Sequence, residues 1–213
     1  MIEVKRMKEL SRDFFREDTR EVAQSLLGKI MVRHLPEGTA VCKIVETEAY
    51  LSHNDPACHA SRGKTKRNEM MFGPPGRAYV YFIYGMYYCF NVVTGEEGQG
   101  EAVLVRALEP IKGIGLMKER RGVKDIFNLT SGPGKLCQAL GIDKGMNGKD
   151  LLKGDLFIVD GGERPKIETS PRVGIRVAID RHFRYYISGN PYISGISRSK
   201  IKEIMEGKEA SRL

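Results

Sequence analysis

The segment Tyr-Val-Tyr-Phe-Ile-Tyr-Gly-Met-Tyr-Tyr-Cys-Phe-Asn-Val-Val, residues 79–93, gathers five of the chain's nine tyrosines into ten positions. Aromatic and β-branched residues fill both halves and one glycine interrupts them, which predicts a β-hairpin with its turn near residues 84–87. With the turn centred near Met86, Tyr81 lies opposite Asn91. The rest of the fold is expected to be arranged around this hairpin.

The two faces of the predicted hairpin differ in chemistry. Strand alternation places phenol, thiol and amide groups on one face, which consists of Tyr79, Tyr81, Cys89 and Asn91. The other face is apolar and is expected to anchor the hairpin in the core through Val80, Phe82, Phe90 and Val92. The polar face suits an aromatic-lined pocket, although such tyrosines equally often cap an ordinary core with their hydroxyls in water. Tyr84 is expected at the tip.

Size and charge narrow the class of protein. With 213 residues and no linker-like segment, the chain is expected to form one domain over residues 1–213, with residues 1–10 and 200–213 at its periphery. The 35 Lys and Arg residues against 27 Asp and Glu residues give a net charge of +8. This charge favours an anionic partner such as nucleic acid, although many basic proteins bind nothing specific.

Cysteines, histidines and hydropathy exclude several classes. The four cysteines are far apart in mostly apolar contexts, so they are expected to be buried free thiols in a reducing compartment. They make no ligand cluster with the four histidines, so no metal and no cofactor are expected. The N-terminus lacks the apolar run of a signal peptide, and no segment approaches the roughly 20 apolar residues of a membrane helix. These features predict a soluble intracellular protein.

The remaining periodic segments predict a chain rich in strands. Strands are expected at residues 29–34, 40–50, 102–108, 156–160, 172–180 and 184–188, and helices at 18–27, 110–121, 133–141 and 199–206. Asp18 or Thr19 is expected to cap the first helix, Pro110 to open the second and Ser131 to cap the third. The polar, aperiodic segment 52–66 is expected to be a functional loop.

The segment Ser-Gly-Pro-Gly-Lys, residues 131–135, resembles part of a phosphate-binding loop. The full G-x-x-x-x-G-K-[ST] pattern is absent, since Leu136 follows Lys135, so nucleotide hydrolysis is not indicated. Lys135 beside a helix N-terminus can still contact one phosphate of a nucleic-acid backbone.

Two carboxylates stand close together on one predicted strand. Alternation places Glu46, Glu48 and Tyr50 on the same face. Adjacent carboxylates repel each other, so either this face is solvated or one carboxylate has a cationic partner or a chemical task. Arg106 lies inside another apolar strand and needs an anion there, which favours the second interpretation.

Five motifs together resemble one enzyme family. They are IVETEAYL (44–51), ACHASRG (57–63), FGPPGRAYVYFIYGMYYCFNV (72–92), LVRALEP (104–110) and SGPGKLCQALGI (131–142). Their residues and order resemble the methylpurine, or alkyladenine, DNA glycosylase family from about Phe15 to Ile193. The family's fold agrees with the strand content, so we expect a β-rich α+β domain whose curved, open-barrel-like antiparallel sheet is surrounded by helices.

The resemblance implies an activity and two catalytic residues. A member of this family hydrolyses the bond between a damaged purine and deoxyribose in duplex DNA, and the reaction starts base excision repair. Glu48 matches the catalytic glutamate, which takes a proton from water and stabilises positive charge on the sugar. Arg106 matches the arginine that holds this water, and it is expected to keep Glu48 ionised. The family uses water rather than a lysine nucleophile, so the enzyme is expected to be monofunctional and to leave an abasic site.

The same resemblance implies how a damaged base is held. The nucleotide is flipped out of the duplex at a cost of roughly a few kcal/mol. Tyr50 and His59 are expected to sandwich the flipped base, Tyr81 to close its edge and Asn91 to crowd the amino group of normal guanine. The DNA-intercalating residues are expected to be Tyr84 and Met86. The expected partner is double-stranded DNA, bound by a monomer, with no membrane.

Some of the chain departs from the family pattern. The loop at residues 117–130 is individual to this chain, and residues 161–171 and those beyond 193 have no residue-level correspondence. Two alternatives stay open from the sequence: a catalytically silent nucleic-acid binder of the same fold, and a small-molecule enzyme related to formyl transferases on a similar barrel. Base release would argue against the first, and strong salt dependence of DNA affinity would argue against the second.

Overall fold

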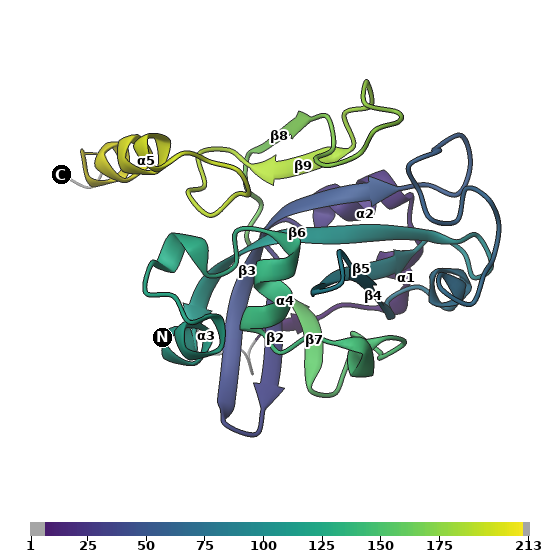
Figure 1. Cartoon of the computed structure of the whole chain (residues 1–213), viewed down its shortest axis with the longest axis horizontal. Helices are drawn as coiled ribbons and strands as arrows, with labels where there is room; N and C mark the ends of the chain where they lie inside the picture. The colour runs from purple at the N-terminus through teal and green to yellow at the C-terminus, as the bar shows by residue number, and fades with distance from the viewer. Residues whose placement is uncertain (1–6, 211–213) are drawn as a thin grey trace.

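A computed structural model describes residues 7–210 of the chain, and within these residues nine strands form one open antiparallel sheet (Figure 1). The strands are β1 (Lys8–Glu9), β2 (Ile30–Leu35), β3 (Gly38–Tyr50), β4 (Ala78–Ile83), β5 (Tyr87–Thr94), β6 (Glu101–Lys112), β7 (Leu156–Asp160), β8 (Ile167–Ser170) and β9 (Arg184–Ile187). Their order is β1-β7-β2-β3-β6-β5-β4, and the β8–β9 pair joins through β9 to β3. The predicted β-rich α+β class is confirmed.

Five helices accompany the sheet in this part of the chain. They are α1 (Arg12–Arg16), α2 (Thr19–Ser25), α3 (Ile114–Arg121), α4 (Pro133–Ala139) and α5 (Arg198–Ala210), with short 3-10 turns at Glu69–Phe72, Ile126–Asn128 and Lys144–Met146. Buried side chains of α2 and α4 join those of the long strands in one hydrophobic cluster. None of the helices in the described residues is long and apolar enough to cross a bilayer.

The long strand β3 changes its neighbour along its length. Its first half pairs with β2, and residues 46–48 pair with β9 on the same edge, while β6 pairs with the opposite edge from Val41 to Tyr50. Register shifts interrupt the β3–β6 ladder between Ile44 and Thr47, and such irregularities bend a strand. Glu46 and Glu48 therefore lie where three strands meet.

The predicted hairpin forms from β4 and β5, but its register differs from the prediction. Tyr81 pairs with Cys89 rather than Asn91, and Tyr79 pairs with Asn91. The turn is centred on Gly85 instead of Met86, because Tyr84 (φ 54°) and Gly85 (φ 68°) both take the left-handed conformation that closes a tight hairpin. The polar face keeps its predicted members, since a change of partner by two residues does not exchange the faces.

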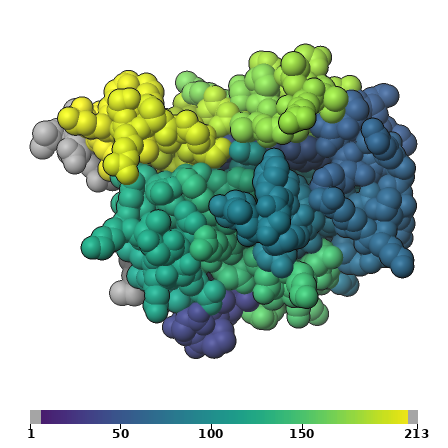
Figure 2. Space-filling model, in the orientation of Figure 1, coloured from purple at the N-terminus to yellow at the C-terminus, as the bar shows by residue number. Residues whose placement is uncertain are grey.

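One residue of the apolar face was wrongly placed in the core. Val80, Phe90 and Val92 are buried as expected, but the side chain of Phe82 is 49% exposed and contacts the ring of Tyr88. Phe82 lies only two residues from the tip, where the hairpin extends beyond the core. In Figure 2 the blue-teal atoms of the hairpin stand at the middle of the face, below the green atoms of the β8–β9 region.

Three other predicted elements were wrong. Pro110 does not open a helix, because β6 continues to Lys112 and α3 begins at Ile114 after Gly113, which has a φ of 78°. Residues 172–180 form no strand, whereas β8 was not foreseen. Ser131 does not cap α4, whose N-cap is Gly132.

The first predicted helix and the thiols are confirmed. The side chain of Asp18 accepts a hydrogen bond from the backbone N–H of Arg20 and so caps α2. The four cysteines are buried and unbridged. The C-terminal helix is confirmed as α5, which is longer than predicted.

Candidate active site

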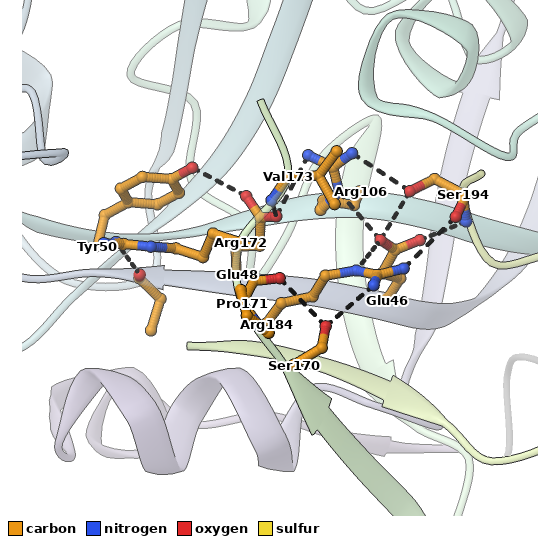
Figure 3. Close-up of polar contacts among 11 residues, drawn as sticks. Glu46, Glu48, Tyr50, Arg106, Ser170, Pro171, Arg172, Val173, Arg184 and Ser194 are labelled. Atoms are coloured by element: carbon orange, nitrogen blue, oxygen red, sulfur yellow. Dashed lines mark hydrogen bonds and ion pairs between the residues drawn. The ribbon is translucent and has the colours of Figure 1, made fainter. Parts of the chain in front are cut away.

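Glu48 lies in the middle of β3 with its side chain fully buried. Its Oε1 accepts a 2.7 Å hydrogen bond from the backbone N–H of Val173, and its Oε2 accepts a 2.8 Å hydrogen bond from the hydroxyl of Tyr50 (Figure 3). Nη1 of Arg106, on the neighbouring strand β6, lies 3.4 Å from Oε1. Three groups from three separate segments therefore fix the orientation of one carboxylate.

The environment of Glu48 changes its proton affinity. Burial raises the pKa of Glu48 above its ordinary value of 4.5, against the opposing effects of Arg106, the Val173 N–H and the Tyr50 hydroxyl. Arg106 thus favours the ionised form as expected, but burial has the larger effect and the resulting direction is upward. A carboxylate that binds a proton more tightly than a surface glutamate is suited to accept one during a reaction.

Arg106 has a second anionic partner that organises the other side of the site. Its Nε lies 3.0 Å from Oε1 of Glu46, and its Nη2 donates to the hydroxyl of Ser194. Glu46 is fully buried and also accepts hydrogen bonds from Arg184, at 2.7 Å, and from the backbone N–H of Ser194. The two carboxylates on one face of β3 therefore share Arg106, and Glu46 holds this arginine in place.

A cavity of about 570 Å³ opens beside Glu48. It is lined by all four residues expected in the base pocket: Tyr50, His59, Tyr81 and Asn91. Arg106 and Val173 also line it, so the groups that hold Glu48 form part of its wall. The structure thus brings the predicted pocket residues and the hydrogen-bond partners of Glu48 together around one cavity.

Aromatic side chains form one wall of the cavity. The rings of His59 and Tyr81 lie 4.6 Å apart at 69°, and Tyr79 lies 5.3 Å from Tyr81. Nδ1 of His59 is 2.9 Å from the hydroxyl of Tyr79. Burial, and then the charge of Arg67, lower the pKa of His59, which favours the neutral imidazole.

Of the other candidate residues, all but Met86 line the cavity. Asn91 is buried and donates a 3.0 Å hydrogen bond from Nδ2 to the carbonyl oxygen of Tyr79. Tyr84, at the hairpin tip, lines the cavity and is 78% exposed, whereas Met86 is 66% exposed and is not among the lining residues. Lys135 lines the cavity near the start of α4, and its ammonium group donates to Oδ1 of Asn128.

Comparison with known proteins assigns the chain to a family. A family model described as methylpurine-DNA glycosylase matches residues 13–191. The chain belongs to the methylpurine-DNA glycosylase family. As a member of this family it is a hydrolase that acts on N-glycosyl bonds, in DNA repair, and its substrate is DNA. The resemblance inferred from the sequence motifs is thereby confirmed.

Two relatives match the chain over most of its length. The chain is 53% identical over 188 residues to a protein of Carboxydothermus hydrogenoformans, covering 87% of this chain and 98% of that protein. It is 48% identical over 193 residues to a protein of Methanocella arvoryzae, covering 88% of this chain and 96% of that protein. Both relatives are named "Putative 3-methyladenine DNA glycosylase".

Three groups in the candidate site were not assigned a site role from the sequence. Glu46 was recognised as half of a repelling pair, and the Glu-x-Glu pattern together with a buried arginine is the signal for its part in the ion-pair network. Tyr79 was placed on the correct hairpin face, next to the predicted pocket residue Tyr81. The backbone N–H of Val173 carries no sequence signal, because its use depends on the loop between β8 and β9.

Proposed function

We propose that this chain is a monofunctional glycosylase that flips alkylated or deaminated purines out of duplex DNA, excises the base by hydrolysis and leaves an abasic site. The proposal includes action as a monomer inside the cell, by one domain over residues 1–213. The observation that carries it is the buried carboxylate of Glu48 beside an aromatic cavity whose edge bears the exposed tyrosine of the hairpin tip.

In the proposed reaction Glu48 acts on a water molecule. The oxygen of the water bonds to the sugar carbon as the bond from that carbon to the base nitrogen breaks, and the departing base keeps the electron pair. Glu48 takes the proton that the water loses, and its negative charge stabilises the positive charge that develops on the sugar. Arg106, next to Glu48 and exposed to the cavity, orients the water.

The cavity suits a flipped purine with a positive charge. Aromatic faces attract cations, and stacking on them is worth about 1 to 3 kcal/mol per base, so Tyr50, His59 and Tyr81 favour alkylated purines. The lowered pKa of His59 supports this role, because a protonated imidazole would repel a cationic base. Lys135, near the edge of the cavity, is proposed to contact a phosphate of the DNA backbone.

The rate of excision is expected to rise with pH through an apparent pKa above 4.5. Glu48 must be ionised to take a proton, and its pKa is raised, so the acidic limb of the profile lies above the ordinary glutamate value. Release of 3-methyladenine from methylated DNA under single-turnover conditions measures this limb after subtraction of uncatalysed depurination. A profile without an acidic limb, or with its midpoint below 4.5, contradicts the role of Glu48.

Replacing Asn91 by serine is expected to relax the rejection of normal guanine. Asn91 is held toward the cavity by its bond to the Tyr79 carbonyl, where its amide would crowd the amino group of guanine. The smaller side chain should raise guanine release about tenfold relative to 3-methyladenine release. The measurement is release of both bases from methylated DNA by the variant and the wild type. An unchanged ratio in a folded variant contradicts the steric role.

The proposed range of substrates is tested with a set of matched duplexes. Each carries one 3-methyladenine, 7-methylguanine, hypoxanthine or ethenoadenine, and an undamaged duplex of the same sequence is the control. We expect release of the alkylated and the deaminated purines above the undamaged control. Release of alkylated bases without hypoxanthine would remove deaminated purines from the proposal, and release of none would contradict the function.

A further inference from the structure

The loop that contacts Glu48 is largely exposed. It connects β8 to β9, contains no helix or strand, and carries the exposed side chains of Val177 and Ile179. Val173 itself is 46% exposed, although its N–H makes a 2.7 Å bond to the buried Glu48. Exposed loops sample many conformations, so a fixed N–H at this position requires an anchor nearby.

The residue immediately before Val173 is anchored through both of its terminal guanidinium nitrogens. Nη1 and Nη2 of Arg172 each lie 2.6 Å from a different oxygen of Asp55, and both side chains are fully buried. Nη1 also donates a 2.9 Å hydrogen bond to the carbonyl oxygen of Ala49 on β3. A two-point contact between a guanidinium and a carboxylate fixes direction as well as distance.

The same arginine lies against a wall residue of the cavity. Its guanidinium carbon is 4.6 Å from the ring centroid of Tyr50 and 5.3 Å from that of Phe183. Asp55 in turn accepts a 3.1 Å hydrogen bond from the backbone N–H of Leu51. Arg172 therefore connects the loop, the end of β3 and the segment after β3, yet it is not among the residues that line the cavity.

We propose that Arg172 is a positioning residue, which, held by Asp55, keeps the Val173 N–H on Glu48 and fixes the ring of Tyr50. The inference rests on the proposed function of Glu48 and adds a residue that acts through it. A buried ion pair contributes little net stability compared with well-packed apolar residues, so its effect here is to fix geometry. A plain structural ion pair would instead affect folding alone.

Loss of the anchor at Arg172 is expected to change the pH profile of excision. A hydrogen bond to the charged form of a carboxylate favours that form, so loss of the Val173 N–H raises the pKa of Glu48 further. The titratable and charged groups near Glu48 come from five segments: Glu46 and Tyr50 on β3, Cys89 on β5, Arg106 on β6, Arg184 on β9 and Arg172 in the loop. The substitution below leaves all of these except Arg172 in place.

The test is Arg172→Lys, which keeps the positive charge but loses the two-point contact and the planar group over Tyr50. We expect the single-turnover release of 3-methyladenine from methylated duplex DNA to fall about tenfold at its maximum, the effect of one lost hydrogen bond to a charged group. The acidic limb should move to higher pH. Affinity for a duplex with one abasic-site analogue should stay within about twofold.

Arg33→Lys is the matched control, because Arg33 is also buried but binds the carbonyl oxygens of His34, Leu140 and Asp155, far from Glu48 along the sheet. It should lower the thermal midpoint without moving the acidic limb. Asp55→Asn removes the charge that holds Arg172 and leaves the sequence of the loop unchanged. It should move the acidic limb in the same direction as Arg172→Lys.

The outcomes separate this inference from the proposed function. A folded Arg172→Lys variant with the acidic limb and maximum rate of the wild type overturns the positioning role while the function stands. The same holds if Arg172→Lys does not fold and Asp55→Asn leaves the limb in place. A wild-type protein that releases no methylpurine overturns the proposed function, and this inference with it.

Discussion

Replacing Glu48 by glutamine is expected to lower the excision rate by about 10²- to 10⁴-fold, the usual contribution of a positioned general base. Glutamine has nearly the same shape, and its amide oxygen can still accept the Val173 N–H. It cannot take a proton from water or supply negative charge. The rate of 3-methyladenine release from methylated duplex DNA under single-turnover conditions measures the effect.

This variant separates catalysis from binding. Its affinity for a duplex with one abasic-site analogue should match that of the wild type, because Glu48 is fully buried and glutamine keeps the shape of its side chain. Glu109→Gln is the matched control, since Glu109 lies on β6 and accepts a hydrogen bond from Asn190 outside the site. Excision by Glu48→Gln at the rate of the control would remove Glu48 from the mechanism.

Replacing Tyr84 by serine is expected to weaken binding to damaged duplex DNA by about 5- to 150-fold. Tyr84 lies in the turn of the hairpin, where its backbone is in the left-handed conformation, and its ring is largely exposed. A ring that fills the gap left by a flipped nucleotide recovers about 1 to 3 kcal/mol of lost stacking. Titration of a duplex with one ethenoadenine, at fixed salt, gives the affinity of each variant.

The same titration tests whether exposure alone explains the effect. Met205→Ser removes another exposed apolar side chain, on α5, which lies beyond the residues that match the family. The affinity of this control should be unchanged, and Met86→Ser should have a smaller effect than Tyr84→Ser because Met86 does not line the cavity. Equal affinity of Tyr84→Ser and the wild type would exclude a wedge at this position.

The sequence predicted the faces of the central hairpin but not its register. Side chains alternate with a period of two, so Tyr79, Tyr81, Cys89 and Asn91 share a face in either pairing. The register depends on the turn. Tyr84 takes the left-handed conformation there, a position usually filled by glycine or asparagine, so the sequence does not indicate where the turn lies.

Two other predictions were wrong because they rested on a proline and on a local apolar pattern. Pro110 has the position expected of a helix start, yet it pairs with Cys42 beside a register shift, where a strand tolerates a residue without an N–H. Residues 172–180 contain enough branched residues to suggest a strand, but they form a loop on which Arg172 binds Asp55. Contacts between residues far apart in the sequence, such as Arg172 and Asp55, determine the structure of this segment, and local sequence patterns do not indicate them.

The sequence motifs predicted which side chains belong to the candidate site. Glu48, Arg106 and the four pocket residues come together at one cavity. The pKa of Glu48 could not be read from the pairing with Arg106, because burial has the larger effect. The hydrogen bond from the Val173 N–H to Glu48 depends on the conformation of a loop. The ion pair between Glu46 and Arg106 is completed by Arg184 on the neighbouring strand β9. Sequence patterns reveal neither contact.

A monofunctional glycosylase breaks the bond between purine and sugar with water and leaves the DNA strand intact. The most direct measurement follows free base and strand length together, after incubation of the protein with an end-labelled duplex that carries one 3-methyladenine. We expect free 3-methyladenine and a full-length strand that breaks only after alkali. Strand breakage without alkali, or a full-length strand that stays resistant to alkali with no free base, would contradict the proposed function.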